Sequence, residues 1–110
     1  MAIEFEGRLI ETDSEGYLLH VEDWSEELMR KMAGLDGIKL NDEHAIVISA
    51  VRNYYKEYAT TPAMRSLIQL LKVEGYANLA SSLKLARLFP AGAAKTAARY
   101  AGLPKPVKCI

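Results

Sequence analysis

The most distinctive chemical group of this chain is the thiol of Cys109, the only cysteine among 110 residues. A single cysteine excludes a disulfide within the chain, and in a reducing compartment such a residue is either a small buried hydrophobe or a nucleophile. Burial is hard to arrange at the residue before last, because chain ends are poorly ordered unless something holds them. Lys108 favours the thiolate and the carboxylate of Ile110 disfavours it, so we expect a partner's surface to complete the activation. The position of Cys109 therefore favours a thiol that reacts with another protein.

The other candidate groups do not predict a site. The two histidines, His20 and His44, lack the spacing of metal ligands and are expected at the surface or half-buried. The segment from Gly92 to Thr96 has a faint likeness to a phosphate-binding loop. Ala94 stands where such a loop carries glycine directly before lysine, however, and no strand precedes it. We therefore expect no metal and no small-molecule cofactor.

The segment that carries Cys109 is typical of an extended arm. Pro104 and Pro106 flank Lys105, which disfavours a helix and favours a polyproline-like conformation. The seven residues that follow Gly102, at roughly 3 Å each, would carry the thiol about 20 Å from the last helix. The sequence thus predicts a single domain over residues 1–102 and a mobile arm over residues 103–110.

The domain before the arm is predicted to be mainly α: a small N-terminal β-hairpin followed by a bundle of about five helices. Ile3 and Phe5 alternate with acids, and a polar loop at residues 12–16 precedes a further apolar stretch, which predicts a hairpin or meander over residues 3–19. Caps and helical spacing predict the helices over residues 23–101.

The expected helix starts, in chain order, are Asp23 with Glu26 as a capping box, Asn41, Thr61 followed by Pro62, Asn78, and Ala93. The expected ends lie at Gly34 and Gly37, at Gly75, at Phe89 and at Gly102. The second helix should carry one continuous apolar stripe that includes Val47, Ala50, Val51, Tyr54, Tyr55 and Tyr58. The buried face of the fourth should hold Leu79, Leu83 and Ala86.

Charge is unevenly distributed along the chain, although the net charge is zero. Residues 1–43 carry 12 acids and 4 bases, and residues 75–110 carry six bases and no acid. A basic end can attract an acidic protein surface or a phosphate backbone. No apolar run is long enough to cross a bilayer, and the N-terminus lacks the pattern of a signal peptide, so we expect a cytoplasmic protein with no membrane partner.

Several segments together resemble the DsrC/TusE family over essentially the whole chain. The most specific is the C-terminal stretch Ala101-Gly102-Leu103-Pro104-Lys105-Pro106-Val107-Lys108-Cys109-Ile110, which ends in a penultimate cysteine. Others are Leu88-Phe89-Pro90, Asp13-Ser14-Glu15-Gly16-Tyr17-Leu18, Asp23-Trp24-Ser25, Val51-Arg52-Asn53-Tyr54-Tyr55 and Thr61-Pro62-Ala63-Met64-Arg65.

The resemblance implies a sulfur carrier whose penultimate cysteine, here Cys109, holds sulfur as a persulfide. The DsrC branch has a second cysteine eleven positions before the last one, where this chain has Ala98. That departure favours the single-cysteine TusE branch. Members of that branch take sulfane sulfur from the TusBCD complex and pass it to MnmA with its bound tRNA, for 2-thiouridine formation at the wobble base.

In this interpretation Arg99, Lys105 and Lys108 would guide docking to an acidic or phosphate-bearing partner. The family pattern is also broken at Ala45, Leu79, Ala80 and Ala93, which bears on the partner more than on Cys109.

Two alternatives stay open at this point. One is a DsrC-like accessory or gamma subunit of a dissimilatory sulfite reductase, against which Ala98 counts. The other is a helix-turn-helix module that binds nucleic acid, built on residues 60–89 with Lys84 and Arg87 in its second helix.

Overall fold

The N-terminal hairpin is shorter than predicted. The computed structural model describes residues 1–106, and in it β1 (Ala2–Phe5) pairs antiparallel with β2 (Arg8–Glu11), with Ile3 opposite Ile10. Glu6 and Gly7, both at positive φ, form the tight turn between them. Beyond β2, a single bridge from Thr12 to Leu18 closes the polar loop, so residues 12–19 extend the hairpin without adding a strand.

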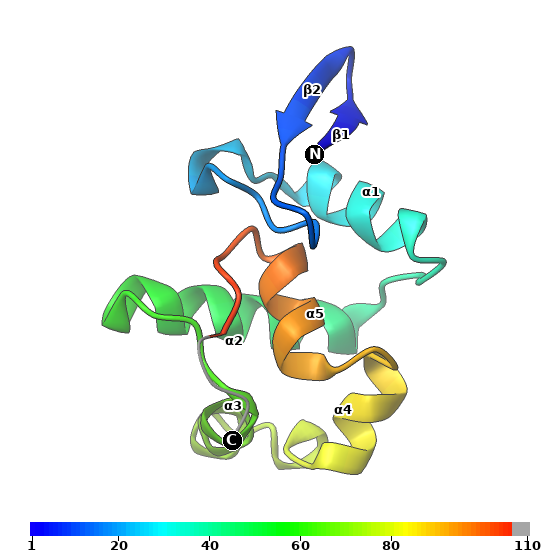
Figure 1. Cartoon of the computed structure of the whole chain (residues 1–110). Coiled ribbons are helices and arrows are strands. Elements are labelled where there is room, and N and C mark those ends of the chain that lie inside the picture. The colour runs from blue at the N-terminus through cyan, green and yellow to red at the C-terminus, as the bar shows by residue number, and fades with distance from the viewer. Residues whose placement is uncertain (107–110) are drawn as a thin grey trace.

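Five α-helices follow within residues 1–106, which confirms the predicted fold class of a mainly α domain with a small N-terminal hairpin (Figure 1). Their bounds are α1 Glu26–Leu35, α2 Asp42–Tyr58, α3 Met64–Val73, α4 Ser82–Leu88 and α5 Ala93–Tyr100. Two short 3-10 helices, η1 (Val21–Asp23) and η2 (Ala77–Leu79), precede α1 and α4. No helix within residues 1–106 is long and apolar enough to cross a membrane.

Helix α5 lies at the centre of the domain and contacts the other four helices (Figure 1). Its small side chains allow this close approach, since Ala97 and Ala98 are both fully buried. Tyr100 fills the last turn and is also fully buried. The residues that lead into the C-terminal arm therefore start from the most enclosed helix of the protein.

The starts of two helices differ from the predictions. Ser25, rather than Asp23, caps α1: its Oγ accepts a hydrogen bond from the backbone N–H of Leu28, and Asp23 lies in η1. Thr61 does not cap α3, which begins two residues later behind Ala63 and has no side-chain cap. The cap predicted at Asn41 is confirmed, and the imidazole of His44 completes a capping box there.

The helix predicted from Asn78 to Phe89 is interrupted. The side chain of Ser81 accepts a hydrogen bond from the backbone N–H of Lys84 and caps a separate helix, α4. This helix packs a different face against the core from the one predicted. Leu85 and Leu88 are buried on this face, whereas Leu83 is 65% exposed. The predicted face of Leu79, Leu83 and Ala86 was therefore wrong beyond Leu79. The helix-turn-helix interpretation of residues 60–89 implies a short turn between two helices, but η2 and its flanking residues separate α3 from α4.

The apolar stripe of α2 is buried over only part of its length. Val47, Ala50 and Val51 lie in the core, but Tyr58 is 57% exposed at the end of the helix. Tyr58 lies in the last turn of α2, beyond the core, where its ring contacts that of Tyr54.

Three helices end in the same backbone motif, at the glycines that the sequence indicated. After α1, α3 and α5 the glycines Gly37, Gly75 and Gly102 adopt positive φ, and the N–H groups of each glycine and of the residue after it bond back to the last turn as a Schellman motif. This shared ending makes the three helix ends directly comparable.

Candidate functional site

Two of the four predicted site residues lie within residues 1–106, the part of the chain that the structure describes. Cys109 and Lys108 lie outside the described residues. Arg99, in the last turn of α5, and Lys105, in the segment that follows, are within them. The site that the structure describes is therefore the root of the arm, residues 100–106, and the side chains that hold it.

The chain leaves α5 through the Schellman motif at Gly102. The N–H of Gly102 donates to the carbonyl of Arg99 at 3.1 Å, and the N–H of Leu103 donates to the carbonyl of Ala98 at 3.0 Å. Leu103 is 2% exposed, so its side chain anchors the segment in the core. The Schellman motif and the buried side chain of Leu103 together fix where the arm begins.

Trp24 and Arg52 bind the two carbonyls that end α5. The indole Nε1 of Trp24 donates to the carbonyl of Tyr100 at 2.7 Å, and Nη1 of Arg52 donates to the carbonyl of Ala101 at 2.7 Å. The guanidinium carbon of Arg52 lies 3.6 Å from the centre of the Trp24 ring, in cation–π contact. Burial lowers the pKa of Arg52 from its ordinary value, although the group stays charged.

Gly102 is required at this point for two reasons. Its φ of +73° is a left-handed conformation that other residues adopt at a cost. A Cβ on Gly102 would also lie 2.7 Å from Cδ1 and 2.8 Å from Cβ of Trp24, closer than real side chains approach. Trp24 therefore packs directly on the turn into the arm.

Two further contacts hold the segment after Leu103. The hydroxyl of Thr61 donates to the carbonyl of Pro104 at 2.8 Å, and Nζ of Lys105 contacts the carboxylate of Glu15 at 2.9 and 3.0 Å. We call Trp24, Arg52 and Thr61 the exit clamp, because each donates to a carbonyl at the point where the chain leaves the domain. The mobility predicted for residues 103–110 stays a prediction, but residues 103–106 contact the domain.

Arg99 is engaged within the protein. Its guanidinium forms an ion pair with Asp36, at the end of α1, and lies over the ring of Tyr100. The hydroxyl of Tyr100 donates to the same carboxylate at 2.7 Å. Burial raises the pKa of Tyr100, and the hydrogen bond to Asp36 adds to the rise. Arg99 and Tyr100 thus bind α5 to α1, close to the exit clamp.

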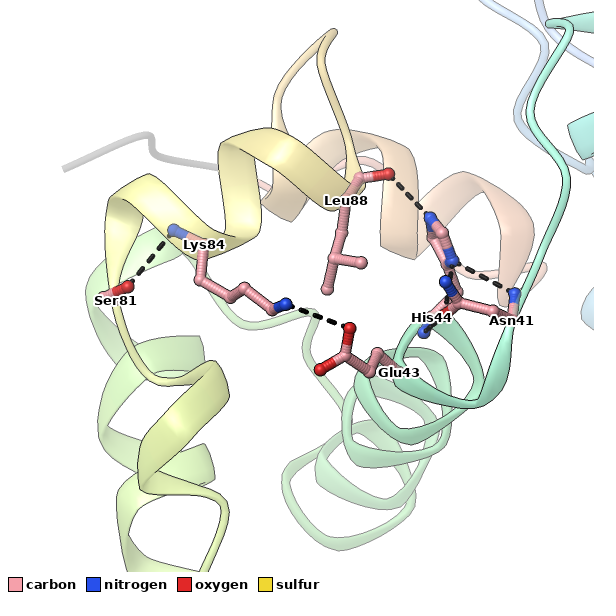
Figure 2. Close-up of polar contacts among 6 residues, drawn as sticks. All are labelled: Asn41, Glu43, His44, Ser81, Lys84 and Leu88. Carbon is pink, nitrogen blue, oxygen red and sulfur yellow. Dashed lines mark hydrogen bonds and ion pairs between the residues drawn. The ribbon is translucent and has the colours of Figure 1, made fainter.

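The uneven charge along the sequence is partly cancelled by folding. Lys84 pairs with Glu43 at 3.0 Å (Figure 2), and Arg99 and Lys105 pair with Asp36 and Glu15. Each of these ion pairs joins a base from the C-terminal third to an acid from the first 43 residues. Within residues 1–106, three bases of the C-terminal third are therefore paired with acids of the same chain.

The structure places one histidine in the core and the other at the surface. His44 is buried: its Nε2 lies 2.8 Å from the carbonyl of Leu88, and its Nδ1 contacts Asn41 (Figure 2). Its ring also meets Phe89 edge-on. His20 lies at the surface near Glu11 and Glu22. Within residues 1–106, no three or more His, Cys, Asp or Glu side chains are grouped so that they could hold a metal ion.

The exit clamp was not identified from the sequence. Trp24, Arg52 and Thr61 each lie within a motif that carried the family resemblance, but nothing local to them points to the arm. They lie 76, 49 and 43 residues from the carbonyls that they bind. The signal that could have found them is that these three motifs and the C-terminal motif all belong to the same family pattern.

Comparison with known proteins places these features in a family. The family model of DsrC-like proteins matches residues 4–110. The chain is 47% identical over 108 residues to a Yersinia pestis protein named sulfurtransferase TusE, covering 98% of this chain and 99% of that protein.

Solved structures agree with the comparison of sequences. The NMR structure of Allochromatium vinosum DsrC matches with a TM-score of 0.88 and 39% identity, covering 99% of this chain and 97% of that one. The oxidised gamma subunit of the dissimilatory sulfite reductase from Archaeoglobus fulgidus matches with a TM-score of 0.84 and 32% identity, over the full length of both chains.

Proposed function

The chain belongs to the DsrC-like family, and on that premise we propose that it is a sulfur carrier whose working group is the thiol of Cys109. The observation that carries the proposal is the family match, which runs through residue 110 and so includes the penultimate cysteine. Relatives that share nearly half of its residues are named sulfurtransferases, which supports a role in sulfur transfer.

The proposed chemistry is thiol–persulfide exchange. The thiolate of Cys109 attacks the terminal sulfur of a donor persulfide; a new S–S bond forms, the donor S–S bond breaks, and the donor leaves as a thiolate. An acceptor thiolate then attacks the terminal sulfur on Cys109, and Cys109 leaves as a thiolate. One sulfur atom moves in each step, so the carrier needs no metal and no acid–base pair of its own.

The proposed partners are inferred from the TusE relatives. We place the chain in the cytoplasm, between a donor complex like TusBCD and an acceptor like MnmA with its bound tRNA, for 2-thiolation of the wobble uridine. Lys105 and Lys108 would contact acidic or phosphate groups of these partners. Lys105 is exposed and would exchange Glu15 for such a group, whereas Arg99 would act mainly by holding α5 to Asp36.

Intact-mass spectrometry tests the carrier role. The wild type is incubated with glutathione persulfide, and we expect the mass of one added sulfur atom, which a thiol reductant then removes. Cys109→Ser should gain no sulfur, and wild-type protein alkylated at its single thiol is the matched control. A Cys109→Ser protein that still gains one sulfur would refute the assignment.

A second candidate function comes from the structural neighbours, since one of them is a sulfite reductase gamma subunit. Chemistry that joins two cysteines of one chain is not available here, because Ala98, at the position of the second cysteine, is fully buried in α5 and carries no thiol. Co-purification with a haem or iron–sulfur partner from the native host would favour this candidate over the relay.

A further inference from the structure

The exit clamp is confined to one of three equivalent helix ends. Helices α1, α3 and α5 all finish in a Schellman motif, at Gly37, Gly75 and Gly102. Within residues 1–106 no side chain donates to the carbonyls that follow α1 or α3, and a Cβ at Gly37 or Gly75 would meet nothing within 4 Å. At Gly102 the carbonyls of Tyr100 and Ala101 are both bound and the indole of Trp24 fills the space.

Stability of the helix end does not account for this arrangement. The Schellman motif alone completes the ends of α1 and α3, so a helix end of this kind does not need side-chain donors. The guanidinium of Arg52 is half-buried against Trp24, and removing water from this charged group costs free energy. That cost would be avoided if water, rather than Arg52, bound the carbonyl of Ala101. What the three donors do add is a fixed direction, because they bind carbonyls at 100, 101 and 104 from three separate parts of the fold.

The direction of the arm at its root matters because the thiol lies only a short way beyond the exit clamp. Cys109 is five residues after Pro104, so its Cα lies at most about 18 Å from that of Pro104. Pro104 and Pro106 restrict the backbone torsions between these points. A root that is fixed in position and direction therefore limits the volume that the thiol can reach, which raises the effective concentration of the thiol on one side of the domain.

We propose that Trp24, Arg52 and Thr61 are positioning residues for sulfur transfer, which set the direction in which the arm leaves α5 and so the side on which Cys109 is presented. The inference rests on the proposed function for its purpose. Its physical claim, that the arm leaves the domain in a fixed direction, does not depend on sulfur transfer. Arg52 suits the role because its planar fork can stack on Trp24 and donate to the carbonyl of Ala101 at the same time, which lysine cannot do.

The experiment uses the single thiol as a labelling site. A nitroxide is attached to Cys109 of the full-length, isotope-labelled protein, and paramagnetic broadening of the backbone amides reports where the arm spends its time. In the wild type we expect broadening concentrated on one side of the domain. Thr61→Val and Arg52→Gln should lose that pattern and spread the broadening over other exposed amides, with Arg52→Lys intermediate.

Matched controls separate direction from folding. Thr60 and Lys56 are exposed neighbours of Thr61 and Arg52, so Thr60→Val and Lys56→Gln should keep the wild-type pattern. Thermal unfolding is measured for every variant. A purely structural role would lower the melting temperature and leave the pattern of the folded state unchanged. If Arg52→Gln fails to fold, Thr61→Val alone decides, since valine keeps the shape of threonine.

Two results would overturn the inference: an even distribution of broadening in the wild type, or a folded Thr61→Val protein with the wild-type pattern. Failure of the carrier role would show instead as sulfur uptake by Cys109→Ser, which leaves the broadening result unaffected. The two failures are therefore distinguishable.

Discussion

Replacing Gly102 with alanine should destabilise the protein much more than the same change at Gly75. The two glycines occupy the same position of the same motif, with φ of +73° and +89°. A Cβ at Gly75 would meet nothing within 4 Å, whereas one at Gly102 would lie 2.7 Å from Cδ1 of Trp24. Any difference between the variants therefore measures the contact with Trp24.

The expected magnitudes are set by these contacts. The left-handed conformation costs an alanine about 1 kcal/mol, and this is the whole effect expected at Gly75. At Gly102 the clash adds about 1–3 kcal/mol, because Trp24 is held by Arg52 and by the carbonyl of Tyr100 and cannot easily shift. If Trp24 does move, its hydrogen bond is lost at about 1 kcal/mol. We expect Gly102→Ala to cost about 2–4 kcal/mol in total.

Urea unfolding provides the measurement, followed by circular dichroism and by fluorescence of Trp24, the only tryptophan of the chain. A gap of about 2 kcal/mol between the variants corresponds to roughly 8–16 °C in melting temperature. Equal costs at Gly102 and Gly75 would refute the packing of Trp24 on the exit turn, and with it the structural basis of the exit clamp.

Three further outcomes test other parts of the structure. Ala59→Gly should raise stability by up to about 1 kcal/mol in thermal unfolding, because Ala59 ends α2 at a φ of +54°; an unchanged or lower melting temperature would contradict this conformation. Ser25→Ala should lower stability by about 1 kcal/mol and Asp23→Ala by much less, since Ser25 caps α1; the reverse order in urea unfolding would restore the sequence-based cap. The raised pKa of Tyr100 means that the unfolded chain loses this proton first, so its contribution to stability is complete below about pH 10 and falls above it. Tyr100→Phe should show a shallower loss of stability over that alkaline range, and identical slopes for the two proteins would show that Tyr100 does not ionise in this way.

The sequence by itself determined the features that depend on neighbouring residues. The glycines that end α1, α3 and α5 were predicted because a left-handed residue after a helix is a local requirement that glycine meets best. The cap at Asn41 and the class of the fold were predicted in the same way, from spacing and periodicity. Even local patterns failed where two residues could do the same task, as with Asp23 and Ser25 before α1.

The tertiary structure alone decided which residues hold the root of the arm. Trp24, Arg52 and Thr61 meet their carbonyls across 76, 49 and 43 residues, and no local pattern encodes such distances. The same holds for charge: the sequence indicated a basic C-terminal third, and folding paired Lys84, Arg99 and Lys105 with acids of the first 43 residues. Helix type and helix ends depend on adjacent backbone groups, whereas a binding site depends on which distant surfaces the packed core brings together.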